Sequence, residues 1–246
     1  MKHIYKLSII LISVFTFIGC NVDDDDPITT AITKDLLASA VEQSEIIGVP
    51  NDTESYDFMV QFSEALPSYS TLEYTIDGVT NTVNVNSGAT SVAISLTFSA
   101  NESFHDVVLT DFIVVNSSAR NFLPSLDGVT SFKVMKVGAF IATMSWDSSA
   151  DLDLDLDVMT NTWGWAFVTL DASAGTANSE TVSSILDDGN YALWIWTNGS
   201  TGQSYTFTVT TIQGVETFTG SVDGNSWNLW ITKSGNNYTY FTEDPA

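Results

Sequence analysis

Cysteine and basic residues are scarce in this sequence of 246 residues, and each shortage excludes a class of protein. A single cysteine excludes an intrachain disulfide, so packing or bound ions must stabilise the fold. Seven Lys and Arg residues stand against 30 Asp and Glu residues, and the formal net charge is −23. Because phosphate groups need cationic partners, this balance argues against binding to nucleic acid, to acidic glycans and to anionic lipid surfaces.

Histidine is also scarce, with His3 near the start and His105 as the one other copy. We expect His105, which stands beside Asp106 and before an apolar run, to be a surface residue at a strand edge. The sequence offers no Ser-His-Asp or Cys-His arrangement and no zinc-binding spacing. We therefore predict a protein that is not an enzyme. A hydrolase with a carboxylate pair is the weakest alternative, because so many acidic residues form pairs by chance.

Residues 1–19 have the pattern of a secretion signal. Lys2 and Lys6 form a basic start, and the apolar run from Leu7 to Ile18 is shorter than the ~20 residues that a spanning helix needs. The sequence Phe17-Ile18-Gly19-Cys20 resembles the bacterial lipobox, although Phe17 replaces the usual Leu. The resemblance implies cleavage before Cys20 and lipidation of Cys20.

Residues 20–35 form an acidic tether, since Asp23 to Asp26 is a run of four carboxylates that cannot collapse onto a core. Its position after Cys20 resembles the acidic export signal of surface lipoproteins from polysaccharide-degrading Gram-negative bacteria. A solvated spacer is the alternative. We expect a lipid anchor in the outer membrane, with the chain facing the extracellular side.

Residues 36–136 are predicted to form an immunoglobulin-like β-sandwich of about seven strands, because apolar residues alternate along runs that turn signals separate. Residues 36–47 fit either a short helix or an opening strand. Two stretches, Tyr74 to Gly78 and Asn86 to Ile94, resemble the Calx-β and related immunoglobulin-like modules of bacterial surface proteins. The further acidic calcium ligands of that family have no counterpart that we can place, so no site is carried over.

Residues 137–246 are predicted to form a second, jelly-roll-like β-sandwich of about nine strands. We expect the strand that ends near Trp146 to form an antiparallel hairpin with the next strand, and two further hairpins to turn at 223–225 and 234–237. Four landmarks in order resemble the bacterial pre-peptidase C-terminal domain: Ser145-Trp146, Ala150 to Leu154, Asp188 to Leu193 and Ser204 to Val209. The resemblance implies an accessory module that supports binding or folding, and some relatives bind calcium or a polymer.

An unusual row of charge lies in the second domain, where four aspartates alternate with three leucines at Asp151, Asp153, Asp155 and Asp157. This alternation predicts a strand that buries the leucines and aligns the carboxylates ~7 Å apart on the other face. Such a row repels itself unless something compensates it. Ca²⁺ is the candidate cofactor because it prefers oxygen ligands, and a solvated acidic face is the alternative.

All seven tryptophans lie in residues 137–246. Trp146 is expected in the core. If Tyr191, Leu193 and Ile195 point inward, Trp194 and Trp196 stand side by side on the outer face, and Trp163 and Trp165 have the same spacing. Adjacent exposed indoles suit sugar rings or a protein partner, whereas burial under the C-terminal hairpins is the competing interpretation.

These observations together predict a non-catalytic, surface-anchored lipoprotein with two β-sandwich domains. The leading hypothesis is binding of a glycan or another extracellular polymer, in a calcium-dependent manner and as part of an outer-membrane uptake system. The alternative is an adhesion or structural protein that binds other proteins.

Overall fold

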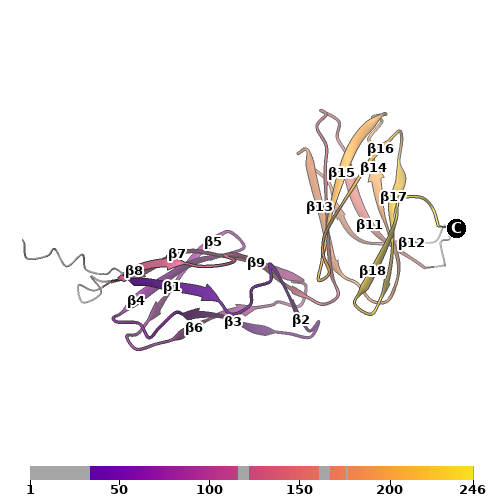
Figure 1. Ribbon diagram of the computed structural model, residues 1–246. Coiled ribbons are helices and arrows are strands. Elements are labelled where there is room, and N and C mark those ends of the chain that lie inside the picture. Colours follow the sequence, from indigo (N-terminus) through magenta and orange to yellow (C-terminus); the bar gives the residue numbers. More distant parts are fainter. Residues whose placement is uncertain (1–33, 116–121, 161–166, 176, 246) are drawn as a thin grey trace, which may run out of the picture.

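The computed structural model describes residues 34–115, 122–160, 167–175 and 177–245 (Figure 1). Every regular element in these ranges is a β-strand, so the predicted all-β class with two consecutive β-sandwiches is confirmed. In the described ranges there is also no helical segment of the length and hydrophobicity needed to cross a membrane. Cys20 lies outside the described residues, as do Trp163 and Trp165.

In the first domain the described residues form nine strands in two sheets. The strands are β1 (Lys34–Ala40), β2 (Ile46–Val49), β3 (Ser55–Phe62), β4 (Ser70–Ile76), β5 (Val79–Val85), β6 (Ser91–Thr97), β7 (Phe104–Val114), β8 (Phe122–Leu126) and β9 (Ser131–Lys136). One sheet has the order β6-β3-β1-β8, and the other has the order β2-β9-β7-β4-β5. Alternate residues of both sheets fill one core, whose largest side chains include Phe58, Phe112 and Phe132.

Nine strands are also described in the second domain. They are β10 (Ala139–Ser145), β11 (Asp153–Met159), β12 (Phe167–Ser173), β13 (Ser179–Ile185), β14 (Gly189–Trp196), β15 (Gln203–Thr211), β16 (Gly214–Val222), β17 (Ser226–Ser234) and β18 (Asn237–Phe241). A four-stranded sheet, β13-β10-β15-β16, faces a five-stranded sheet, β12-β11-β14-β17-β18. Leu152, Leu154 and Leu156 are fully buried between them, and Trp146 is buried as predicted.

A two-residue connection joins the domains, because β9 ends at Lys136 and β10 begins at Ala139. Both domains bind this connection. The backbone N–H of Gly138 donates to Asn51 Oδ1 of the first domain over 2.7 Å, and the hydroxyl of Tyr238 in the second domain donates to the Gly138 carbonyl over 3.2 Å. Contacts from both sides therefore restrain the junction.

Two of the predicted hairpins are wrong. β10 pairs with β13 and β15, whereas β11 pairs with β12 and β14, so the segment after Trp146 crosses from one sheet to the other. Likewise β16 pairs with β15 and β17 pairs with β14, so the turn at 223–225 also changes sheets. The predicted turn at 234–237 does form the β17–β18 hairpin. The alternation of apolar residues identifies the buried face of a strand, but it does not identify the neighbouring strand.

Two further expectations in the first domain are resolved. Residues 36–47 contain the end of β1, a short connection and the start of β2 rather than a helix, because β1 pairs with β3 and β8 while β2 pairs with β9. His105 is buried rather than exposed, since only 6% of its surface is accessible. Its Nδ1 lies 2.7 Å from Asp77 Oδ2 and its Nε2 lies 3.0 Å from the Thr97 carbonyl oxygen. Both ring nitrogens of the buried imidazole thus have a hydrogen-bond partner, as buried polar groups usually do. The contact with Asp77 joins β7 to the turn between β4 and β5.

Candidate functional site

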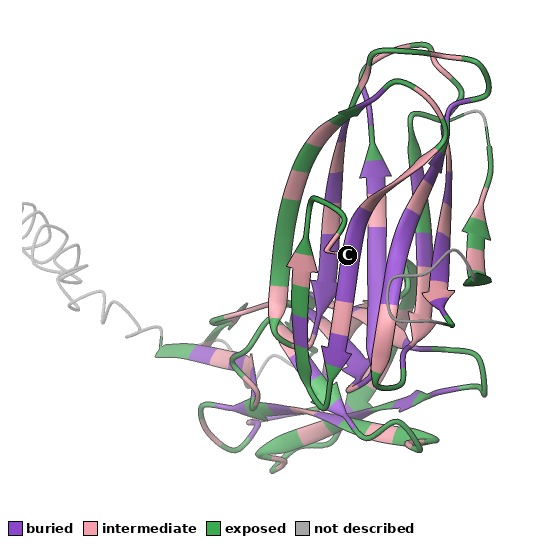
Figure 2. Ribbon diagram, turned by 90° about the vertical axis from the view of Figure 1, so that its right-hand side faces the viewer, coloured by how far each residue is buried: buried purple, intermediate pink, exposed green. Residues whose placement is uncertain are grey.

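The outer face of the five-stranded sheet brings the aspartates and two of the predicted tryptophans together. Asp153 is paired with Trp196 across β11 and β14, and Asp155 is paired with Trp194. Directly opposed residues of antiparallel strands share a face, so these four side chains lie on one side of the sheet. Their neighbours Leu193 and Ile195 are fully buried on the other side. Figure 2 shows this sheet with its buried central strands and its exposed edge strand.

Asp157 does not lie on an exposed acidic face, because only 1% of its surface is accessible. The hydroxyl of Thr169 donates to its Oδ1 over 2.8 Å, and the indole N–H of Trp227 donates to its Oδ2 over 3.0 Å. Thr169 comes from β12 on one side, and Trp227 reaches over from β17 on the other. The expectation of four aligned, exposed carboxylates is therefore wrong for this one.

Asp155 is half-buried and bound by the second indole. The N–H of Trp196 donates to Asp155 Oδ2 over 2.7 Å. Burial raises the pKa of Asp155 above its usual value, and the charges of Asp157 and Asp153 raise it further, while the hydrogen bond from Trp196 acts in the opposite direction. The carboxylates of Asp153, Asp155 and Asp157 therefore still repel one another.

The exposed end of the row is bridged by an amide. The Nδ2 of Asn198 lies 3.2 Å from Asp151 Oδ2 and 3.1 Å from Asp153 Oδ2, so one side chain links both carboxylates. Asp151 precedes the first residue of β11. Asn198 adopts the left-handed backbone conformation at φ 46°, which asparagine tolerates better than most residues. The turn after β14 thus places this amide over the row.

The four carboxylates accept hydrogen bonds from neutral donors. These donors offset part of the repulsion between the carboxylates, which a cation would otherwise have to offset. Among the described residues, no group of three or more His, Cys, Asp or Glu side chains is arranged to hold a metal ion. The Ca²⁺ hypothesis for this row stays a prediction. The donors Thr169, Asn198 and Trp227 were missed at the sequence level, since each is distant in sequence from the carboxylate that it binds.

Four aromatic rings follow one another across the same face, and we call them the aromatic strip: Trp196, Trp194, Trp227 and Phe167. The ring centroids are 5.6 Å apart for Trp196 and Trp194, 4.9 Å for Trp194 and Trp227, and 5.3 Å for Trp227 and Phe167. Each contact is edge-to-face, with interplanar angles of 66°, 73° and 84°. Edge-to-face packing is a favoured geometry for aromatic pairs, so the rings support one another.

The two ends of the aromatic strip are open to solvent, and its centre is not. Trp196 is 41% exposed and Phe167 is 46% exposed. Trp194 is partly buried between its neighbours, and its indole N–H is buried with no hydrogen-bond partner in the described part of the chain. On the same face Trp230 is nearly buried beside Met159 and Ala192. Among the tryptophans described on this face, Trp196 is exposed, Trp194 is partly buried and Trp230 is nearly buried.

The comparisons with known proteins concern the fold alone. No protein-family model matches the sequence, and no curated protein matches it. Among solved structures, the apo form of the Calx CBD1 domain matches with 9% identity and a TM-score of 0.29, over 41% of this chain and 96% of that chain. CBD12 from CALX1.2 matches with 12% identity and a TM-score of 0.28, over 65% and 79%.

A third solved structure, the calcium binding domain CBD12 of CALX1.1, matches with 9% identity and a TM-score of 0.28, over 70% of this chain and 79% of that chain. The resemblance of residues 137–246 to the pre-peptidase C-terminal family stays a prediction.

Proposed function

We propose that this chain is a non-catalytic, surface-anchored lipoprotein that binds a neutral glycan through the aromatic strip. The observation that carries the proposal is the series of four rings in edge-to-face contact, with exposed aromatic surface at both ends. Flat apolar ring faces suit the C–H faces of sugar rings, and an exposed cluster of large aromatic side chains marks an interaction surface.

Hydrogen bonds to the aspartate row hold two rings of the strip in place. Trp196 donates to Asp155 and Trp227 donates to Asp157, and both acceptors belong to a strand in the middle of the sheet. A ring that is already oriented loses little conformational entropy when a ligand binds, so more of the contact energy contributes to affinity. The aspartates thereby support a binding surface without contacting the ligand.

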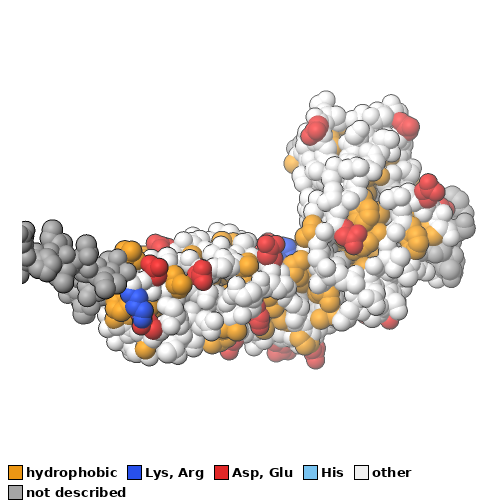
Figure 3. All heavy atoms as spheres, in the orientation of Figure 1, with side chains coloured by type: hydrophobic (Ala, Val, Ile, Leu, Met, Phe, Trp, Pro, Cys, Tyr) orange, Lys and Arg blue, Asp and Glu red, His pale blue; other side chains and the backbone are white. Residues whose placement is uncertain are grey.

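The charge of the chain favours a neutral ligand. The sequence has 30 acidic residues and seven basic ones, and Figure 3 shows red side chains at many places and blue ones at few. A sulfated or carboxylated glycan would approach a repulsive field. Neutral polysaccharides are therefore the ligand class that the surface fits best.

The anchor is the second part of the proposal. The lipobox-like sequence at Cys20 and the acidic residues behind it support a lipid-anchored protein on the outer face of the outer membrane. Replacing Cys20 by Ser should release the protein from the membrane fraction or leave the leader uncut. A processed Cys20→Ser chain that still sediments with membranes would contradict lipidation.

Affinity electrophoresis in gels that contain neutral polysaccharides tests the ligand. We expect retardation of the wild-type chain in at least one of β-glucan, xylan or mannan gels, and loss of retardation for Trp196→Ala. The matched control is Tyr69→Ala, because Tyr69 is an aromatic residue of the first domain with a similar exposed fraction of 44%. Equal retardation of the two variants would remove the aromatic strip from the proposal.

Binding to another protein is the second candidate, and the edge strand β12 favours it. Val168 and Leu170 of this strand are 55% and 42% exposed, and no charged residue lies between Phe167 and Leu170. An apolar edge strand is a ready partner for a strand of another chain. Val168→Lys should abolish such pairing and leave retardation in polysaccharide gels unchanged.

A further inference from the structure

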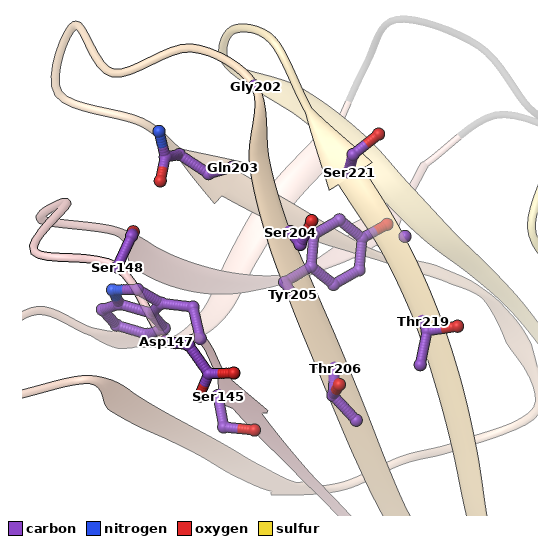
Figure 4. Close-up of a pocket in the computed structure, with 12 residues that line it drawn as sticks. Ser145, Asp147, Ser148, Gly202, Gln203, Ser204, Tyr205, Thr206, Thr219 and Ser221 are labelled. Atoms are coloured by element: carbon purple, nitrogen blue, oxygen red, sulfur yellow. The ribbon is translucent and has the colours of Figure 1, made fainter.

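A hollow with a volume of about 810 Å³ lies on the other sheet of the second domain, over β10, β15 and β16 (Figure 4). Its volume falls within the range of about 300–1,000 Å³ that is usual for ligand pockets. Hydroxyl groups dominate its lining: Ser145, Ser148, Ser204, Thr206, Thr219 and Ser221. The aromatic strip belongs to the five-stranded sheet, so the two features lie on different sheets.

The register of the sheet arranges these hydroxyls in rows. Ser145 is paired with Thr206, which is paired with Thr219 on its other side, and Ser204 is paired with Ser221 two residues further along. Paired side chains are about 4.5–5.5 Å apart, and successive rows on one face are about 7 Å apart. The five side chains alternate with buried or partly buried neighbours, so they face away from the core. Figure 4 shows Ser204 and Thr206 along one strand and Thr219 and Ser221 along the next.

Two glycines and two buried aromatic residues complete the lining. Gly202 and Gly220 line the hollow without side chains, and Gly220 is paired with Tyr205. Tyr205 and Trp146 also border the hollow, but their rings are buried in the core of the domain. The hydroxyl rows, and not these rings, therefore form the surface that a ligand would contact.

The five outward hydroxyls have unused hydrogen-bonding capacity. Within the described residues none of them has a side-chain hydrogen bond, whereas the hydroxyls of Thr143 and Thr181 in the next row bond to each other over 2.9 Å. A hydroxyl both donates and accepts, as the hydroxyls of a sugar do. Asp147 is the one charged residue of the lining, and the lining contains no Lys or Arg that could neutralise a phosphate or carboxylate.

We propose that this hydroxyl-lined hollow is a second saccharide site, which binds a short segment of a neutral oligosaccharide. The hollow would bind the same class of ligand as the aromatic strip, and to that extent this proposal rests on the proposed function. It uses other residues on another sheet, and a short soluble probe distinguishes it from the aromatic strip. Two sites on opposite sheets would let one domain contact two chains of the same polymer, which raises the effective affinity.

Isothermal titration of the detergent-solubilised full chain with cellohexaose, laminarihexaose and mannohexaose tests the proposal. The test variant is Thr206→Val with Thr219→Val, which removes two hydroxyls and keeps the β-branched shape. The control is Thr208→Val with Thr217→Val, a paired position in the next row that does not line the hollow. We expect the test variant to bind at least one hexasaccharide about tenfold more weakly than wild type, and the control to bind it unchanged.

Three outcomes would overturn the proposal: equal affinities of the test and control variants, loss of hexasaccharide binding in Trp196→Ala instead, or no binding of any of the three probes by the wild type. None of these outcomes is a failure of the proposed function, which is tested by retardation in polysaccharide gels. If polysaccharide gels retard the chain through Trp196 and no hexasaccharide binds, the aromatic strip would stand as a glycan site and the hollow would be rejected as one.

Discussion

The indole N–H of Trp196 donates to Asp155 over 2.7 Å, which joins an exposed aromatic residue of one central strand to a half-buried carboxylate of its neighbour. The same relationship recurs between Trp227 and Asp157, where the carboxylate is buried. Two aspartates of a row that would repel itself in isolation thus serve as acceptors for two indoles.

Asp157→Ala should lower the free energy of unfolding of the second domain by about 1–3 kcal/mol, because it removes the buried carboxylate that accepts hydrogen bonds from Thr169 and Trp227. Asp157→Asn keeps one acceptor and should cost less. Asp153→Ala is the matched control, since its partner is an exposed amide and surface changes usually stay within about 0.5 kcal/mol. Urea denaturation measures all three, and equal losses for the two alanine variants would contradict the stated role of Asp157.

Asp155→Asn should stabilise the protein at neutral pH, because it removes a carboxylate whose pKa is raised and keeps an acceptor for Trp196. A raised pKa in the folded state favours folding at low pH, and this contribution is lost as the pH rises through the folded pKa. The gain should therefore be largest at pH 7 and vanish near the usual Asp pKa of about 4.

The magnitude should stay below about 0.5 kcal/mol, because the carboxylate is only partly buried and solvent screens it. Urea denaturation at both pH values measures it, with Asp52→Asn in the first domain as the control at an exposed position. A gain that does not change with pH would mean that ionisation of Asp155 is not its source.

Calcium provides the third test. Since neutral donors already bind all four carboxylates, Ca²⁺ must displace a donor to bind the row. The Ca²⁺ hypothesis predicts a larger rise in the melting temperature than NaCl of equal ionic strength causes, and equal rises for the two salts would contradict it. A ligand that binds the folded state alone raises the melting temperature by mass action. A larger rise with millimolar Ca²⁺, together with a saturable calorimetric heat, would establish a cation site and show that Ca²⁺ displaces a donor such as Asn198.

The junction between the domains provides the fourth test. A Cβ at Gly138 would lie 2.9 Å from the backbone carbonyl oxygen of Leu186, which is too close for either to remain in place. Gly138→Ala should therefore lower the melting temperature of the full chain by several degrees, which corresponds to about 1 kcal/mol for a domain of this size. Gly224→Ala is the control, because nothing lies within 4 Å of its added Cβ. Identical melting temperatures would contradict a tight junction.

The sequence predicts which face of a strand is buried, because this depends only on the residues of that strand. The alternation in Tyr191 to Trp196 is a property of one strand, and it placed Leu193 and Ile195 in the core and Trp196 outside. The identity of the neighbouring strand is not local. The separation of β10 from β11, and of β16 from β17, depends on which apolar faces meet across the core.

The acceptor roles of the aspartates could not be predicted for the same reason. Asn198 lies beyond the end of β14 and Trp227 lies in β17, three strands further along the chain, so both approach the row only after the sheet has assembled. His105 shows the same limit. Its partner Asp77 comes from the tight turn between β4 and β5, and no sequence pattern connects that turn with β7.

The central claim is that glycan contacts the exposed end of the aromatic strip, and the indole N–H resonances of the seven tryptophans test it most directly. In a ¹⁵N-labelled full chain, assigned through single Trp→Phe variants, a retarding neutral polysaccharide should shift the Nε1–H signal of Trp196 and leave that of the buried Trp146 in place. An unmoved Trp196 signal at a polysaccharide concentration that still retards the protein would contradict the claim.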